Sequence, residues 1–196
     1  PMAERLTAIA IRESDHLNEI VTGFLDFARD PSKRREVFSL QDLLIEVENQ
    51  IRQKFQHASK LRIRHSASRN APCLILGDHM QLRQVFINIC QNAVEAMNET
   101  GTLSITLNPG PAPSDQGRRR GPIEVRFDDE GPGIAPDKVA RIFEPFYTEK
   151  EHGVGMGLAI CMRVVTAHDG TIQVASRPGG GASIIVRLPA ATGSMS

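Results

Sequence analysis

Apolar residues recur at steps of three and four through residues 3 to 29, which predicts one long helix with an apolar seam interrupted by Glu13. The helix should end before Asp30-Pro31, because proline disfavours the helical conformation in the residue before it. A single helix cannot bury such a seam, so we expect a partner helix from elsewhere.

The rest of the chain alternates between helical and strand periodicity. Ser39 and Asp78 each precede an apolar pattern of helical period, where their side chains can cap a helix. Residues 108–122 are rich in proline, glycine and arginine, and we expect a mobile hairpin loop there. The expected elements are helix 39–56, strand 61–65, strand 73–76, helix 78–98, strands 102–107 and 123–127, a short helix 135–143, helix 158–165, and a closing hairpin of strands 170–175 and 182–188.

This order of elements predicts an α+β fold, a two-layer α/β sandwich preceded by one long helix. We expect a mixed sheet on one side and three main helices on the other. The boundaries that we predict are a helix at 1–30, a polar linker at 31–38, the main domain at 39–190 and a disordered tail at 191–196.

Composition narrows the possible partners. The 23 basic and 23 acidic residues balance, so no overall field recruits nucleic acid or a membrane surface. No apolar run approaches the roughly 20 residues that span a bilayer. The three cysteines lack metal-type spacing and lie in apolar stretches, which indicates reduced core thiols and a cytoplasmic chain.

Two glycine clusters flank an aromatic and proline-containing segment. The first is Asp129-Glu-Gly-Pro-Gly133, after a strand-like run, and the second is Gly153-Val-Gly-Met-Gly157, directly before a helical pattern. Glycines let the backbone approach phosphate oxygens, and the free N–H groups of a helix start face an anion. We therefore expect residues 134–152, called the cover below, to close over a phosphate-bearing ligand. The spacing fits neither a Rossmann fingerprint nor a P-loop.

A polar face also lies on the expected helix 78–98. Asn88, Asn92 and Glu95 are four and three residues apart, so they stack on one side of the helix. An amide oxygen suits Mg²⁺ that is otherwise held by waters and phosphates. Spacing alone equally fits the exposed face of an amphipathic helix.

Together these motifs resemble the ATP-binding catalytic domain of sensor histidine kinases, in the gyrase, heat-shock chaperone, histidine kinase and MutL superfamily. The N box is Asn88 to Ala96, the first glycine box Asp129 to Gly133, the F box Phe143 to Phe146, and the second glycine box Gly153 to Leu158. The resemblance covers roughly residues 1 to 190. It implies a Bergerat ATP-binding fold that binds Mg·ATP and transfers the γ-phosphoryl group to a histidine, for onward transfer to a response-regulator aspartate.

The resemblance also implies roles for individual residues. Asn92 is the implied Mg²⁺ ligand, and Asp129 would accept the exocyclic amine of adenine and reject guanine. The catalytic set would be Asn88, Glu95 and Lys150. Phe143 and Phe146 would be apolar plugs that pin the cover to the core. The implied ATP contacts are Asn88, Asn92, Asp129, Gly131, Gly133, Ile134, Phe146, Thr148, Lys150, His152, Gly153, Gly155, Gly157 and Leu158.

Helix 1–30 resembles the second helix of the dimerisation hairpin, so the resemblance implies a homodimer in the intact, possibly membrane-anchored parent. His16 is followed by Leu-Asn-Glu and lacks the phosphoacceptor motif, so we expect that this chain does not label itself. One alternative is an ATP hydrolase of the superfamily, but its catalytic glutamate position holds Asn88 here. Another is a non-catalytic nucleotide-binding regulatory module.

Overall fold

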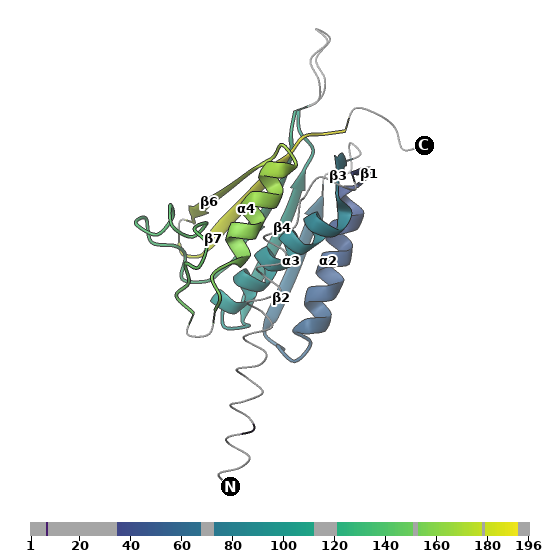
Figure 1. The fold of residues 1–196 in the computed structure, drawn as a ribbon. Helices are drawn as coiled ribbons and strands as arrows, with labels where there is room; N and C mark the ends of the chain where they lie inside the picture. Colours follow the sequence, from purple (N-terminus) through teal and green to yellow (C-terminus); the bar gives the residue numbers. More distant parts are fainter. Residues whose placement is uncertain are drawn as a thin grey trace.

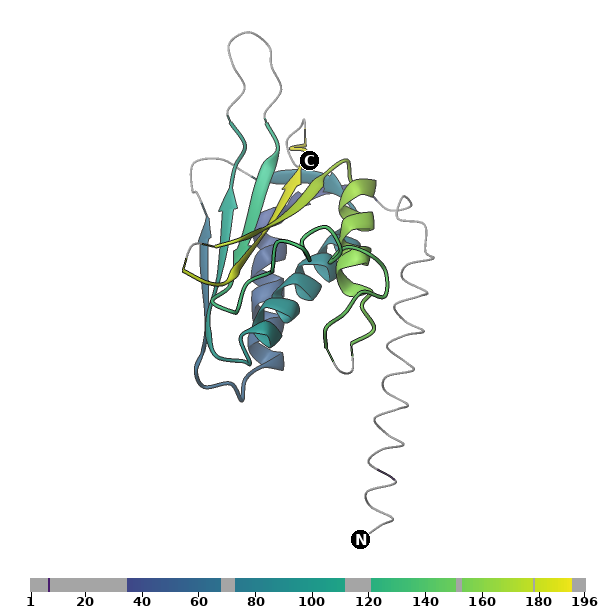
Figure 2. The same ribbon diagram turned by 90° about the vertical axis from the view of Figure 1, so that its left-hand side faces the viewer.

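A mixed five-stranded sheet forms one layer of the fold, and helices cover one of its faces (Figures 1 and 2). The computed structural model describes residue 7 and residues 35–67, 73–111, 121–150, 153–177 and 179–191. Its elements are β1 (Glu36–Ser39), α2 (Leu40–Lys54), β2 (Leu61–Ala67), β3 (Leu74–Gly77), α3 (His79–Ala96), β4 (Gly101–Asn108), β5 (Ile123–Asp128), α4 (Gly157–Ala167), β6 (Thr171–Ser176) and β7 (Ala182–Leu188).

The main sheet has the strand order β2-β4-β5-β7-β6, and β1 pairs with β3 in a separate two-stranded sheet. Strand β2 runs parallel to β4, and the other neighbours in the main sheet are antiparallel. The predicted antiparallel pairing of β4 with β5 and the closing hairpin of β6 and β7 are therefore confirmed.

Both predicted caps begin helices. The Ser39 hydroxyl accepts a hydrogen bond from the Asp42 N–H at 3.2 Å, and the Asp78 carboxylate accepts one from the Gln81 N–H at 3.1 Å. Each satisfies a backbone donor that has no partner inside the helix.

The core lies between the helices and the sheet. Phe86 of α3 and Phe127 of β5 are nearly fully buried, with ring centroids 5.5 Å apart. Burying a side chain of this size stabilises the fold by about 1.5–3 kcal/mol. All three cysteines are buried and none forms a disulfide, as predicted. Among the described residues, no helix has both the length and the apolar character needed to cross a bilayer.

Two expectations, one about the linker and one about the cover, were wrong. The expected polar linker contains strand β1, because Phe38 turns inward and is 9% exposed. The short helix at 135–143 is a series of turns, with bonds such as Lys138 N to Ala135 O at 2.9 Å. None of its side chains is fully buried, so no apolar face anchors a helix there.

Residues at the predicted boundary of the domain pair with β3. Ala190, the last residue of the predicted domain, pairs with Ile75, and the N–H of Ala191, the next residue, donates to the Leu74 carbonyl at 2.8 Å. The predictions for helix 1–30 apart from residue 7, for most of loop 108–122 and for the tail after residue 191 lie outside the described residues.

Candidate functional site

Helix α3 carries the predicted polar face. Asn88 and Asn92 are half-buried and Glu95 is exposed, because the opposite side of the helix faces the core. The Asn88 amide oxygen accepts a hydrogen bond from Gln84 at 2.9 Å. Burial raises the pKa of the Cys161 thiol on α4 to about 12, and a hydrogen bond with Asn88 opposes this shift. The polar face therefore adjoins α4.

Asp129 follows β5 and is 6% exposed. Its Oδ1 accepts hydrogen bonds from the N–H groups of Gly131 at 2.8 Å and Ala182 at 3.0 Å. The Arg177 guanidinium donates to the Asp129 carbonyl at 2.8 Å. Among the described residues, no hydrogen bond uses Oδ2 of Asp129, so one oxygen of a well-oriented carboxylate remains available to a ligand donor.

The first glycine box packs against the turn between β6 and β7. Gly133 has a φ of +79°, and a Cβ placed on it would lie 3.0 Å from the Gly181 carbonyl oxygen. The Ser176 hydroxyl donates to the Ile134 carbonyl at 2.6 Å. A Cβ on Gly181 would lie only 2.0 Å from the Asp129 carbonyl oxygen. Glycine is therefore required where these two backbones meet.

Lys150 joins the cover to α3. Its ammonium donates to Oδ1 of Asn92 at 2.7 Å and to the Glu95 carboxylate. The hydroxyl of Thr148 accepts from the Lys150 N–H at 3.1 Å, and a Cβ on Gly153 would lie 2.6 Å from that hydroxyl. The oxygens of Asn92 and Glu95 thus both accept hydrogen bonds from the Lys150 ammonium.

The start of α4 lies beside Asn92. A Cβ on Gly157 would be 3.8 Å from the Asn92 amide nitrogen, and Met156 supplies no side-chain cap to the helix. Gly155 has a φ of +70° and would place a Cβ 2.6 Å from the Phe146 carbonyl carbon. Leu158 is half-buried against the core. The uncapped first turn leaves N–H groups and the positive end of the helix dipole for an anion.

The two phenylalanines of the F box behave differently. Phe143 packs against the core as predicted. Phe146 is 66% exposed with a φ of +68°, so it is not a plug in this structure and the prediction was wrong. Its backbone passes close to Gly155, where an added Cβ would lie 2.6 Å from the Phe146 carbonyl carbon. His152 lies outside the described residues.

Ion pairs within the cover hold its turns together. Lys138 and Glu149 are 2.5 Å apart, and the hydrogen bond from Lys138 lowers the pKa of the Glu149 carboxyl. The Arg141 guanidinium lies over the Tyr147 ring, 4.6 Å from its centroid. All of these contacts are internal to the cover. The polar contact of the cover with α3 is made by Lys150.

Sequence reasoning missed the contribution of the turn between β6 and β7. Arg177, Ser176 and Gly181 fix Asp129 and Ile134, although they lie more than 40 residues away along the chain. The run Gly179-Gly-Gly181 is a local signal of a tight turn, but it does not indicate which distant residues the turn contacts.

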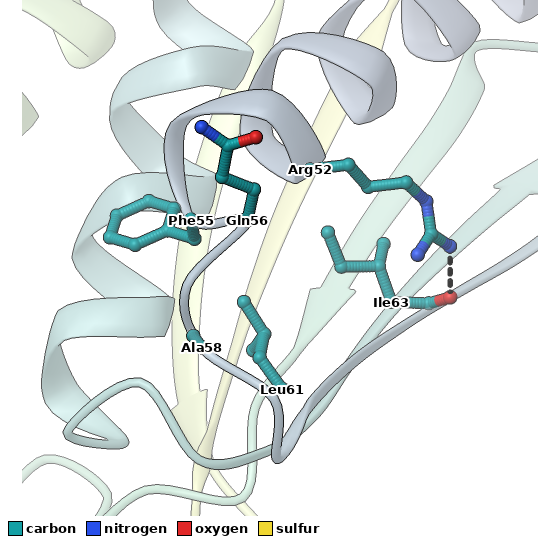
Figure 3. A pocket seen from close by; sticks show the side chains of 6 residues that line it. All are labelled: Arg52, Phe55, Gln56, Ala58, Leu61 and Ile63. Atoms are coloured by element: carbon teal, nitrogen blue, oxygen red, sulfur yellow. Dashed lines mark hydrogen bonds between the residues drawn. The ribbon is translucent and has the colours of Figure 1, made fainter.

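A pocket of about 180 Å³ lies at the end of α2 (Figure 3). The Arg52 guanidinium in this pocket donates hydrogen bonds to the Glu48 carboxylate and to the Ile63 carbonyl, each at 2.7 Å. The pocket contains none of the predicted site residues. The lining consists of Arg52, Phe55, Gln56, Ala58, Leu61 and Ile63.

Comparison with known proteins agrees with this geometry. Residues 77–192 match the family described as histidine kinase-, DNA gyrase B- and HSP90-like ATPase. The sensor histidine kinase ZraS of Escherichia coli (strain K12) is 30% identical over 187 residues, which are 95% of this chain and 38% of ZraS. The chain therefore spans less than half of that relative.

Solved structures are similar as well. The catalytic domain of histidine kinase ThkA matches 81% of this chain and 97% of its own length, at 28% identity and a TM-score of 0.69. Full-length ShkA in complex with AMPPNP matches 97% of this chain and 40% of its own, at 32% identity and a TM-score of 0.76. ThkA in complex with the response regulator TrrA matches 93% of this chain and 50% of its own, at 26% identity and a TM-score of 0.72. The predicted two-layer fold is confirmed.

Proposed function

Because the chain belongs to the histidine kinase-, DNA gyrase B- and HSP90-like ATPase family, we propose that its domain binds Mg·ATP and transfers the γ-phosphoryl group to a protein histidine. Within the family, the domain is of the histidine kinase catalytic type. The observation that carries the proposal is the meeting of three elements at Asn92: the Lys150 ammonium from the cover, the first turn of α4, and Glu95. The relatives are sensor kinases, which favours a kinase over a hydrolase or a regulatory module.

The two ends of the nucleotide would be recognised by different chemistry. The available oxygen of Asp129 would accept the exocyclic amine of adenine, whereas guanine places a carbonyl at the same position. The first turn of α4 and the Lys150 ammonium would receive the phosphates. Gly131, Gly133 and the other glycines would let the backbone approach the nucleotide.

The protein would act by positioning and electrostatics rather than by covalent chemistry. Oδ1 of Asn92 would hold Mg²⁺, which neutralises charge on the phosphates when bound. Lys150 would exchange its contact with Asn92 for a phosphate oxygen and stabilise the charge of the transferring group. Asn88 is half-buried one turn away, where its amide can orient a phosphate or a water of the metal.

The whole protein would act together with partners. We infer a separate dimerisation hairpin that carries the phosphoacceptor histidine, a homodimeric parent, and a response regulator. The structure of ThkA with TrrA supports the last of these. Because the proposed substrate of the domain is ATP, which is supplied in the cytoplasm, the domain would act there, whether or not its parent is anchored in a membrane.

Calorimetric titration with Mg·ADP and Mg·GDP, on the wild type and on Asp129→Asn, tests the nucleotide site. We expect selective binding of Mg·ADP, weakened by about ten-fold to a hundred-fold in the variant, because a charged hydrogen bond contributes about 1.5–3 kcal/mol. The asparagine can keep both hydrogen bonds of Oδ1, so the variant should fold normally. Equal affinity for both nucleotides would contradict the assignment of Asp129.

Transfer from γ-labelled ATP to a separately supplied hairpin tests the reaction. We expect label on the hairpin histidine with the wild type, and none with Asn92→Ala or with a hairpin whose histidine is replaced by glutamine. Release of inorganic phosphate without any labelled hairpin would indicate a hydrolase, and label on this chain itself would refute the assignment of the acceptor to a separate helix.

A further inference from the structure

Helices α3 and α4 run antiparallel and touch at both ends. At one end, Gly157 of α4 adjoins Asn92, and at the other, His168 directly after α4 contacts Asp78, the cap of α3. The 11 residues of α4 separate these ends by about 16 Å. Whatever fixes the His168 end therefore also fixes where the first turn of α4 lies beside Asn92.

His168 joins the two helices by both ring nitrogens. Its Nε2 accepts a hydrogen bond from the Asp78 N–H at 2.9 Å, and its Nδ1 donates to the Val164 carbonyl at 2.8 Å. The residue is 3% exposed, and a Cβ on Gly77 would lie 2.8 Å from the ring. This arrangement allows one tautomer and one position of the ring, so α4 cannot slide along α3 without breaking a buried hydrogen bond.

Arg35 binds the same end of α4 from outside. Its guanidinium donates to the Ala167 carbonyl and to the Asp169 carboxylate at 3.3 Å. Carbonyl groups at the end of a helix lack partners within the helix and carry the negative end of its dipole, so a cation there is stabilising. Arg35 lies directly before β1, where the chain enters the domain.

We propose that Arg35 is a positioning residue for the phosphate-binding end of the nucleotide site, acting through α4 and His168. Contacts made where the chain enters the domain then change phosphate affinity at the far end of the helix. The inference rests on the proposed function, because it assigns regulation to the same site. Coupling requires a physical connection between the two ends, and here it is one short helix held at both ends.

The test compares Arg35→Ala and Arg35→Lys with Arg187→Ala. Arg187 is a matched control, because its side chain is also 32% exposed and pairs with a carboxylate, that of Glu124 on β5. The measured quantities are the dissociation constants of Mg·ADP and of adenosine, which presents the same base without phosphates. A general loss of stability would change the dissociation constants of both ligands or of neither.

We expect Arg35→Ala to raise the dissociation constant of Mg·ADP by about two-fold to thirty-fold and to leave that of adenosine unchanged. Arg35→Lys should show a smaller increase, since lysine can still reach the Ala167 carbonyl, and Arg187→Ala should show none. Equal weakening of both ligands, or equal effects of Arg35→Ala and Arg187→Ala, would overturn the proposal.

Hydrogen exchange without nucleotide separates failure of this inference from failure of the proposed function. The Ile160 N–H bonds the Met156 carbonyl at 2.9 Å in the first turn of α4. Arg35→Ala should accelerate its exchange and Arg187→Ala should not. If exchange responds but the wild type binds no Mg·ADP, the proposed function fails and Arg35 still positions α4. If exchange does not respond, Arg35 does not control this helix.

Discussion

Lowering the pH from 7.5 to 5.5 should destabilise the protein through His168. Burial lowers the pKa of His168 below its ordinary value of 6.5, and the nearby Arg35 acts in the same direction. Protonation would add a proton to Nε2, which accepts from the Asp78 N–H at 2.9 Å, so two donors would face each other. The folded protein therefore resists protonation more than the unfolded chain does.

The sign follows from proton linkage. Because the folded pKa is depressed, the unfolded chain binds more protons as the pH falls below about 6.5, and each additional proton favours unfolding. The stability due to neutral His168 is complete above that pH and is lost progressively down to the folded pKa. One group can contribute at most about 1.4 kcal/mol for each pH unit in that window.

Urea unfolding at pH 7.5 and 5.5 measures the effect in the wild type and in His168→Gln. A glutamine amide offers one acceptor and one donor group without titrating, so the variant should lose less stability on acidification, by up to about 1.4 kcal/mol. His57, His65 and His79 each pair with a glutamate, and they remain in both proteins. The reasoning is refuted if the two proteins lose the same free energy of unfolding.

Further predictions concern the glycines and Lys150. Gly181→Ala should lower the free energy of unfolding by about 2–4 kcal/mol, through a clash with the Asp129 carbonyl and a φ of +86°, in a denaturant titration. Gly179→Ala, which has a φ of +90° and open space, should cost only about 1–2 kcal/mol, and equal costs would contradict the clash. Gly155→Ala should weaken the binding of Mg·ADP by about ten-fold or more and change the free energy of unfolding less, because the affected contact lies in the cover. Calorimetry and melting curves measure the two effects, and a large loss of stability with unchanged Mg·ADP affinity would contradict this prediction. Lys150→Met should weaken Mg·ATP by about ten-fold to a hundred-fold and spare adenosine, and equal weakening of both ligands would argue against a phosphate contact.

Local sequence was sufficient for elements that carry their own signals. Ser39 and Asp78 begin helices because a side chain within three residues satisfies a backbone donor. The cover shows the limit of such reasoning. Residues 135–143 have helix-forming composition but bury no complete face, and Phe146 is exposed with a φ of +68° although its side chain is apolar.

The sequence by itself determined the fold class, the order of the motifs and the shared face of Asn88, Asn92 and Glu95, because helical periodicity and glycine spacing are local properties. Only the tertiary structure brought Lys150 to Asn92, 58 residues away, and the Ala182 N–H to Asp129, 53 residues away. The contact between His168 and the Asp78 N–H spans 90 residues. Two of these three contacts use backbone N–H donors. Every residue except proline has such a donor, so the type of residue does not predict these contacts. Their partners are decided when strand order and helix packing bring distant backbone into place.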